Sequence, residues 1–161
     1  MTGTWLSSGF VVPERLVGDG FVLVPLGPEH NASDHDAWGS SIEHIRATPG
    51  FTPEQWGGDD WPVPMSLERN LADLEMHAGE FERREAFAYT VLAGDGDGAT
   101  VIGCVYIDPD VTGAADAMVR CWVCADRAEL DAVLTRAVRA WLADAWPWRS
   151  VRFPGRDTLG G

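Results

Sequence analysis

Hydrophobic and polar positions follow their clearest pattern between residues 100 and 153. In residues 117–124, alternate side chains form one wholly apolar face and one mixed face, which is typical of a strand. From Leu130 to Ala145 the period becomes that of an amphipathic helix. The apolar stripe is formed by Leu130, Val133, Leu134, Ala137, Val138, Trp141, Leu142 and Ala145. The pattern predicts a strand over 100–108, a strand over 117–124, this long helix and a short strand over 150–153.

The ends of the long helix carry their own signals. Asp126 is a candidate N-cap, and Glu129 stands three residues later, as in a capping box. Pro147 follows the last apolar position and marks the helix end. We therefore expect the helix to begin just after Asp126.

Upstream of residue 100 the same criteria predict two strands and two helices joined by turns and loops. In order, these are an irregular arm over 1–19, a strand over 21–26, a helix over 34–47, a Pro/Gly/Trp-rich loop over 48–65, a helix capped by Ser66 with its apolar stripe over 67–81, a strand over 87–92 and a hairpin turn over 95–98. Three consecutive strands followed by a helical crossover predict a mixed central sheet flanked by helices, an α/β or α+β fold. A chain of 161 residues is expected to form a single domain over 1–161.

Composition and charge exclude several classes of function. The net charge of −13 opposes nonspecific nucleic-acid binding. All 12 basic residues are arginine, so lysine-dependent Schiff-base chemistry and a Walker phosphate loop are excluded. No apolar run reaches about 18 residues, and the N-terminus lacks a basic segment followed by an apolar one, so we expect no membrane partner and a cytoplasmic location.

Metal binding is not expected either. His30, Asp34, His35 and Asp36 fit no metal-ligand spacing, and a solvated turn is the expected setting for them. Cys121 and Cys124 lie three apart in a predicted strand and would point to opposite faces. We therefore expect no metal and no disulfide from them.

Positive charge is concentrated near the end of the chain. Residues 120–156 hold seven arginines against four acidic residues, whereas the remainder is strongly acidic. An anionic cofactor would bind more favourably here than elsewhere in the chain. A solvated helix face is an equally good explanation of the concentrated positive charge.

The element order, with segments 23–30 (LVPLGPEH), 101–109 (VIGCVYIDP) and 127–132 (RAELDA), resembles the GNAT superfamily of acyl-CoA N-acyltransferases. The layout is similar to that of RimJ/RimL-like members and extends over residues 18–153. The resemblance implies a GNAT-like fold and acetyl-CoA as co-substrate.

In that superfamily the strand before the long helix parts from the next strand, and the pantetheine arm of coenzyme A enters the gap. The following turn binds the pyrophosphate through backbone amides at the helix N-terminus. The resemblance implies a cofactor site at Trp122, Val123, Arg127, Ala128, Leu130 and Ala132. Leu130 replaces the first glycine of the family's turn, and Glu129 and Asp131 add negative charge there.

The family usually continues with a further helix and strand, where this sequence has only PGRDTLGG. We therefore expect a C-terminally shortened version of the fold. We therefore predict a homodimer that covers the sheet end near Trp146, Trp148 and Phe153, with an interface that includes residues from 146–161. The alternative is that the tail or the arm over 1–19 folds back as a local cover.

The acceptor site would lie near the first helices in this family. The resemblance implies His44, with neighbouring Glu43, and Tyr106 as catalytic candidates. Substrate contacts are expected from Trp38, Trp56, Trp61, Asp108 and Arg120. The leading hypothesis is an acyl-CoA-dependent N-acyltransferase, most simply an N-acetyltransferase, for a small-molecule or peptidic amine. The alternatives are a GNAT-fold protein that binds a small apolar ligand or does other chemistry without coenzyme A, and a purely associating module.

Overall fold

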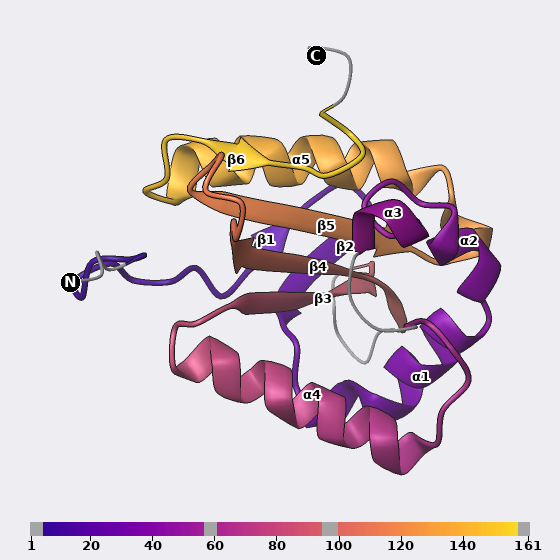
Figure 1. Cartoon of the computed structure of the whole chain (residues 1–161). Helices are drawn as coiled ribbons and strands as arrows, with labels where there is room; N and C mark the ends of the chain where they lie inside the picture. The colour runs from indigo at the N-terminus through magenta and orange to yellow at the C-terminus, as the bar shows by residue number, and fades with distance from the viewer. Residues whose placement is uncertain (1–4, 57–60, 95–99, 158–161) are drawn as a thin grey trace.

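A mixed sheet forms the centre of the molecule. The computed structural model describes residues 5–56, 61–94 and 100–157 (Figure 1). In these ranges six strands lie in sequence order across the sheet. They are β1 (Leu16–Val17), β2 (Phe21–Pro25), β3 (Phe87–Ala93), β4 (Val101–Pro109), β5 (Ala117–Val123) and β6 (Val151–Arg152). Neighbours from β1 to β5 are antiparallel, whereas β6 runs parallel to β5, as a helical crossover requires.

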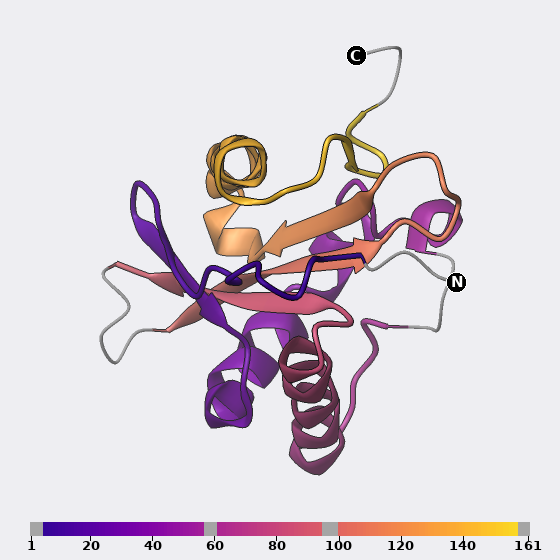
Figure 2. The ribbon, with the colours of Figure 1, turned by 90° about the vertical axis from the view of Figure 1, so that its left-hand side faces the viewer.

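Helices cover both faces of the sheet. The helices are α1 (Asn31–Gly39), α2 (Ile42–Arg46), α3 (Pro53–Trp56), α4 (Leu67–Glu82) and α5 (Leu130–Ala145), with 3-10 turns η1 (Pro28–His30) and η2 (Ala125–Arg127). Figure 2 shows α5 on one face, and α1 and α4 on the other. None of the helices in the described ranges combines the length and the apolar character that a membrane span requires.

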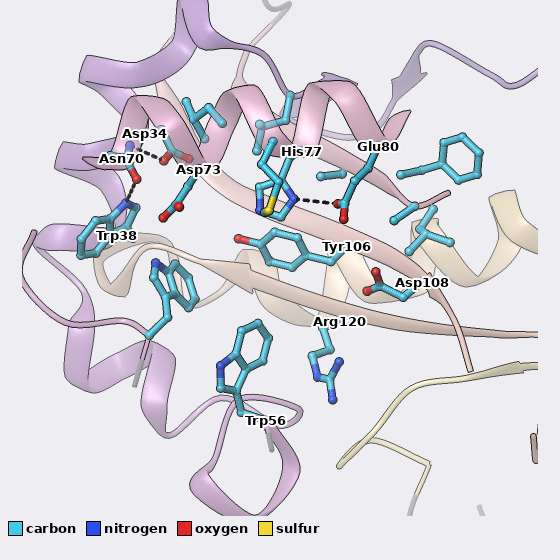
Figure 3. Close-up of a pocket in the computed structure, with 18 of the residues that line it drawn as sticks. Asp34, Trp38, Trp56, Asn70, Asp73, His77, Glu80, Tyr106, Asp108 and Arg120 are labelled. Atoms are coloured by element: carbon cyan, nitrogen blue, oxygen red, sulfur yellow. Dashed lines mark hydrogen bonds and ion pairs between the residues drawn. The ribbon is translucent and has the colours of Figure 1, made fainter. Parts of the chain in front are cut away.

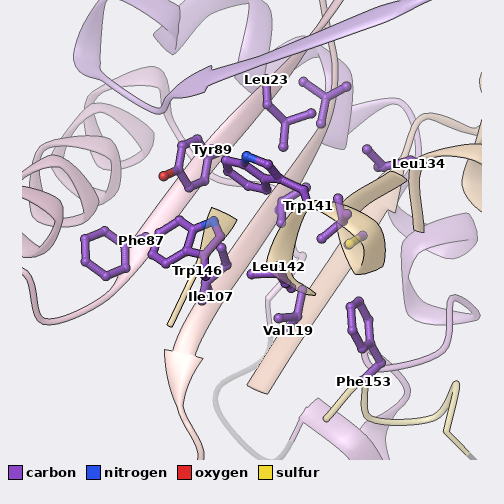
Figure 4. Packing of buried hydrophobic residues seen from close by; sticks show 14 of the residues in the cluster. Leu23, Phe87, Tyr89, Ile107, Val119, Leu134, Trp141, Leu142, Trp146 and Phe153 are labelled. Atoms are coloured by element: carbon purple, nitrogen blue, oxygen red, sulfur yellow. The ribbon is translucent and has the colours of Figure 1, made fainter. Parts of the chain in front are cut away.

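The predicted alternation along 117–124 is confirmed. Val119, Cys121 and Val123 pack in the core between the sheet and α5, with Leu134 and Val138 of that helix (Figure 4). The intervening Trp122 and Cys124 lie in a second core, beneath α1 and α4. The two faces of this strand therefore pack in different cores. Cys121 and Cys124 are free thiols on opposite sides of the sheet.

The helix predicted over 34–47 is divided in two. The first part, α1, ends at Gly39, and α2 begins at Ile42. Glycine and serine are weak helix formers, and the Ser41 hydroxyl accepts a hydrogen bond from the Ala125 amide at 2.9 Å. The break therefore ties the end of α1 to the turn that follows β5.

Two predicted helix starts have different outcomes. Ser66 caps α4 as expected, since its hydroxyl accepts from the Arg69 amide at 3.0 Å. The capping box of Asp126 and Glu129 is wrong, because Asp126 lies within η2 and Glu129 is an N-cap without a side-chain hydrogen bond. The hairpin turn predicted over 95–98 lies outside the described residues.

The N-terminal arm covers the apolar end of the sheet. Trp5 stacks on Trp148 with ring centroids 4.7 Å apart, and Phe10 packs on Trp146 at 5.6 Å. The indole of Trp148 also donates to the Trp5 carbonyl at 3.2 Å. The local cover expected as the alternative to a second copy is therefore present, so these rings no longer argue for a homodimer, which stays a prediction.

Candidate functional site

A cavity of about 570 Å³ lies between α4 and the sheet, on the face that α1 also covers (Figure 3). Its walls come from α4, from strands β4 and β5, and from tryptophans of α1 and of the segment between α2 and α4. The volume is typical of small-molecule sites.

The wall formed by α4 is polar. Residues spaced three and four apart share one face of a helix, and on α4 that face carries Asn70, Asp73, His77 and Glu80. The imidazole Nδ1 of His77 lies 3.6 Å from the Glu80 carboxylate, and burial lowers the pKa of His77 although Glu80 opposes this. Burial therefore favours the uncharged imidazole, whereas the neighbouring carboxylate of Glu80 favours the protonated one.

Asn70 connects this wall to α1. Its side-chain oxygen accepts from the Trp38 indole at 3.1 Å, and its amide donates to the Asp34 carboxylate at 3.1 Å. Burial raises the pKa of Asp34 to about 6, and the hydrogen bond from Asn70 limits the rise. A carboxyl with a pKa of about 6 therefore belongs to the cavity lining.

The strand wall carries Tyr106 and Asp108 of β4 and Arg120 of β5. Tyr106 lies opposite Arg120 in the ladder, and its hydroxyl accepts from the Trp122 indole at 3.1 Å. Burial holds the pKa of Tyr106 well above its usual range. Its phenol stays protonated and can donate a hydrogen bond toward a ligand.

Asp108 and Glu80 approach the cavity from opposite walls, as Figure 3 shows. Burial raises the pKa of Asp108 to about 6, Arg120 lowers it, and the negative charge of Glu80 raises it further. Two carboxyl groups that disfavour each other's charge would both be stabilised by a cation between them.

The third wall is aromatic. Trp61 lies at its centre, with ring centroids 5.8 Å from Trp56, 5.9 Å from Trp38 and 6.4 Å from Tyr106. Rings from α1, α3, the α3–α4 connection and β4 therefore meet around one space, which is the arrangement that binds apolar or cationic groups.

Arg120 fixes the segment that carries Trp56. Its guanidinium donates to the carbonyls of Gly50 at 2.8 Å and Gln55 at 2.7 Å, and lies 5.2 Å from the Trp56 ring centroid. Gly50 has φ of +97°, a left-handed conformation that glycine adopts without strain. Arg120 is thus engaged with backbone oxygens and an aromatic ring.

A second feature lies on the other edge of β5. Among the described residues, the ladder with β6 includes Ala117 and Met118 of β5, and β6 ends at Arg152, so the rest of β5 has no strand on this edge. Arg156 fills the space beside β5, because its guanidinium donates to the Cys121 carbonyl at 3.2 Å and pairs with Asp131 of α5 at 2.7 and 2.8 Å. Its Nε is buried with no hydrogen-bond partner among the described residues. The gap that the family resemblance assigns to coenzyme A therefore contains this side chain.

The predicted cofactor residues surround this second feature. Trp122 and Val123 are buried, so only their backbone could face a ligand. Arg127 is half-buried at the end of η2, and its own amide donates to the Cys124 carbonyl at 2.9 Å. Ala128 and Ala132 are exposed, and Leu130 opens α5. Their role toward a cofactor stays a prediction.

The predicted substrate residues come together in the cavity, whereas two catalytic candidates do not. Its lining includes Trp38, Trp56, Trp61, Tyr106, Asp108 and Arg120. Glu43 and His44 lie on α2, outside the lining formed by the described residues.

Sequence reasoning missed four acidic or imidazole groups of the lining, Asp34, Asp73, His77 and Glu80. The three on α4 carried a signal, since they follow Asn70 at helical spacing. The solvated turn expected around Asp34 is wrong, because Asp34 is buried in α1. Within the described ranges no group of three potential ligands could hold a metal ion.

The architecture is similar to that of several solved acetyltransferases. Mycobacterium smegmatis RimJ in complex with CoA-disulfide matches with a TM-score of 0.65 and 16% identity over 91% of this chain and 68% of that one. The apo RimL ribosomal L7/L12 alpha-N-protein acetyltransferase gives a TM-score of 0.58 at 12% identity, over 84% and 70%. The Microcin C7 self immunity acetyltransferase MccE, in complex with acetyl-CoA and AMP, gives 0.57 at 12%, over 78% of this chain and 62% of that one.

No family model and no curated protein matches the sequence. This chain spans less than two thirds of the length of MccE. At such low identities the similarity establishes architecture and not activity. The chain therefore shares the fold of these solved acetyltransferases, with the layout of the RimJ and RimL proteins.

Proposed function

We propose that the protein is an acyl-CoA-dependent N-acyltransferase, most simply an N-acetyltransferase, for a small-molecule or peptidic amine bound in the cavity. The observation that carries the proposal is the cavity itself, in which carboxyl groups and aromatic rings converge. An ammonium group suits these walls, and the fold is shared with acetyltransferases solved with CoA-disulfide or acetyl-CoA.

Side chains of the cavity can accept and donate the protons that such a transfer requires. Acetyl-CoA supplies an acetyl thioester, whose carbonyl carbon bonds to the amine nitrogen while its C–S bond breaks and the sulfur takes up a proton. Asp108 or Glu80 can take up the proton that the ammonium group must lose before the neutral amine attacks, and His77 lies beside Glu80. The protonated hydroxyl of Tyr106 can donate toward developing negative charge. His44 with Glu43 stays a further prediction for the base.

The fit of coenzyme A to the second feature depends on Arg156. Arg127 is the cation that would hold its pyrophosphate near the start of α5. The negative charge of Asp131 would repel the pyrophosphate unless Arg156 stays close to neutralise it. Arg156 also donates a hydrogen bond to the Cys121 carbonyl beside β5. Binding therefore requires Arg156 to turn away from Cys121.

The same contacts favour a second candidate function. If Arg156 stays on Asp131 and Cys121, the gap is closed, and the chain would be a GNAT-fold protein that binds a ligand in the cavity without coenzyme A. Leu130, in place of the glycine of the family's turn, also favours this candidate.

Thermal unfolding with and without acetyl-CoA separates the two candidates. A ligand at 100 times its Kd adds about 2.7 kcal/mol to the free energy of unfolding. We expect stabilisation by acetyl-CoA that desulfo-coenzyme A reproduces and free pantetheine does not. No shift at millimolar acetyl-CoA would favour the second candidate.

Two expectations from the sequence remain proposals. A cytoplasmic location suits an enzyme that uses acetyl-CoA. The homodimer is tested by light scattering at tens of micromolar protein, where a mass near 17.5 kDa would rule it out.

A further inference from the structure

We infer that the cavity selects a small-molecule cation with an aromatic or branched apolar body. The cationic group would lie between Glu80 and Asp108, and the body against Trp56 and Trp61. This rests on the proposed function in that the cation is its amine acceptor, but it concerns recognition and not transfer.

The balance of charge in the cavity supports a positively charged ligand. Among the described residues, the cavity lining contains four carboxyl groups, Asp34, Asp73, Glu80 and Asp108, and two guanidiniums, Arg69 and Arg120. Arg69 is exposed, and Arg120 donates to two backbone carbonyls. The interior therefore has more carboxyl groups than cations, and a bound anion would be repelled.

The aromatic rings of the cavity support an apolar body on that ligand. An aromatic group that packs on tryptophan or tyrosine in an offset or edge-to-face arrangement gains about 0.5–1.5 kcal/mol beyond the burial of its area. Trp61 and Tyr106 meet nearly edge to face at an angle of 82°, and Trp56 lies beside Trp61. A ligand with both a charge and an apolar body satisfies the carboxyl groups and these rings together.

The size of the cavity indicates how large the ligand is. About 570 Å³ exceeds what a simple inorganic cation or ammonium would fill. The space beyond the carboxyl pair is bordered by apolar side chains such as Leu74 and Val63. The bulk of the ligand is therefore apolar, with its charge at one end.

The test is titration calorimetry at pH 7.5 with three probes that share a benzyl group. Benzyltrimethylammonium carries a permanent positive charge and cannot be acetylated, N-benzylacetamide is neutral, and phenylacetate is an anion. We expect the cation to bind at least tenfold more tightly than either of the others. Equal affinities, or no binding of the cation at millimolar concentration, would overturn the inference.

Variants locate the cation. Glu80→Gln and Asp108→Asn should each weaken benzyltrimethylammonium by about threefold to tenfold, between the values for exposed and buried charge contacts. Glu75→Gln, on an exposed position of α4 outside the cavity lining, is the matched control. Unchanged affinity in both cavity variants would overturn the proposed position.

A measurement on the unaltered protein does not depend on variant folding. Asp108 is surrounded by Arg120 of β5 and Glu80 of α4, with His77 beside Glu80. Since the probe does not titrate, its affinity should rise several-fold from pH 5 to pH 7.5 as Asp108 ionises. A flat profile would count against the carboxyl pair.

Acetyl-CoA is titrated separately, so the two proposals fail differently. Binding of the cation without binding of acetyl-CoA would overturn the proposed function and keep this inference. Binding of acetyl-CoA without selectivity for the cation would do the reverse.

Discussion

The Arg156 guanidinium holds the Asp131 carboxylate through two hydrogen bonds, 2.7 and 2.8 Å long. The pair joins the segment after β6 to the first turn of α5, and a third bond reaches the Cys121 carbonyl of β5. Both side chains are largely shielded, with 11% of Arg156 and 29% of Asp131 exposed. Removal of one partner therefore leaves a poorly solvated charge.

A double-mutant cycle measures this pair. Arg156→Gln and Asp131→Asn should each lower the free energy of unfolding by about 1–2 kcal/mol, and the double variant by clearly less than the sum. Urea denaturation gives the values, and Arg136→Gln at an exposed position of α5 is the control. Strictly additive effects would show that the two charges do not stabilise each other.

The same double variant tests whether the pair obstructs coenzyme A. It removes the ion pair that must rearrange and the negative charge beside the expected pyrophosphate. We expect acetyl-CoA to bind it about threefold to tenfold more tightly than the wild type, by calorimetry. Weaker binding would mean that Arg156 contributes more as a phosphate ligand than it costs as an obstruction.

Arg127 is predicted to bind the pyrophosphate of coenzyme A. Arg127→Ala should then weaken acetyl-CoA by roughly 1.5–3 kcal/mol, the scale of a charge-assisted hydrogen bond. The control is Arg136→Ala, at an exposed position in the second turn of α5. Equal affinities of wild type and Arg127→Ala would remove Arg127 from the site.

Asp34 should make stability depend on pH. Its pKa in the folded state is about 6 against 3.8 for an ordinary aspartate, so the neutral form is favoured by folding. The associated stability is present below pH 3.8 and is lost as pH rises through about 6.

Asp34→Asn keeps an acceptor for Asn70 and removes this titration. Its free energy of unfolding, relative to wild type, should therefore increase by about 2–3 kcal/mol between pH 4 and pH 7.5. Asp36→Asn, exposed on the same helix, should show no such change. A pH-independent difference between Asp34→Asn and wild type would contradict the assigned pKa.

Local patterns predicted most of the fold. Periodicity identified β5 and α5, because each strand or helix face packs on a continuous apolar layer. The break at Ser40 and Ser41 was not predicted, since it depends on the contact between Ser41 and the distant Ala125 amide. The Asp126 cap failed for a related reason: residues 125–127 form a 3-10 turn before the helix begins.

The candidate site was harder to predict than the fold. Aromatic residues in a Pro/Gly-rich loop indicated Trp56 and Trp61, since exposed rings need a surface to cover, and both rings line the cavity. The sequence indicated His44 as a candidate base, but the histidine in the cavity lining is His77. Its position could not be predicted, because only the packing of α4 on the sheet decides which face of that helix is enclosed. The filling of the gap by Arg156 depends on contacts between segments far apart in the chain.

Acetyl transfer to an amine is the central claim, and product formation tests it most directly. Radiolabelled acetyl-CoA is incubated with the protein and with cationic amines such as benzylamine and phenethylamine, and acetylated amine and free thiol are quantified together. We expect equal amounts of both, formed faster than the spontaneous rate. The rate should fall at least tenfold in Asp108→Asn or Tyr106→Phe, while Glu75→Gln retains the full rate. Amines that bind in the cavity but are never acetylated in the presence of acetyl-CoA would contradict it.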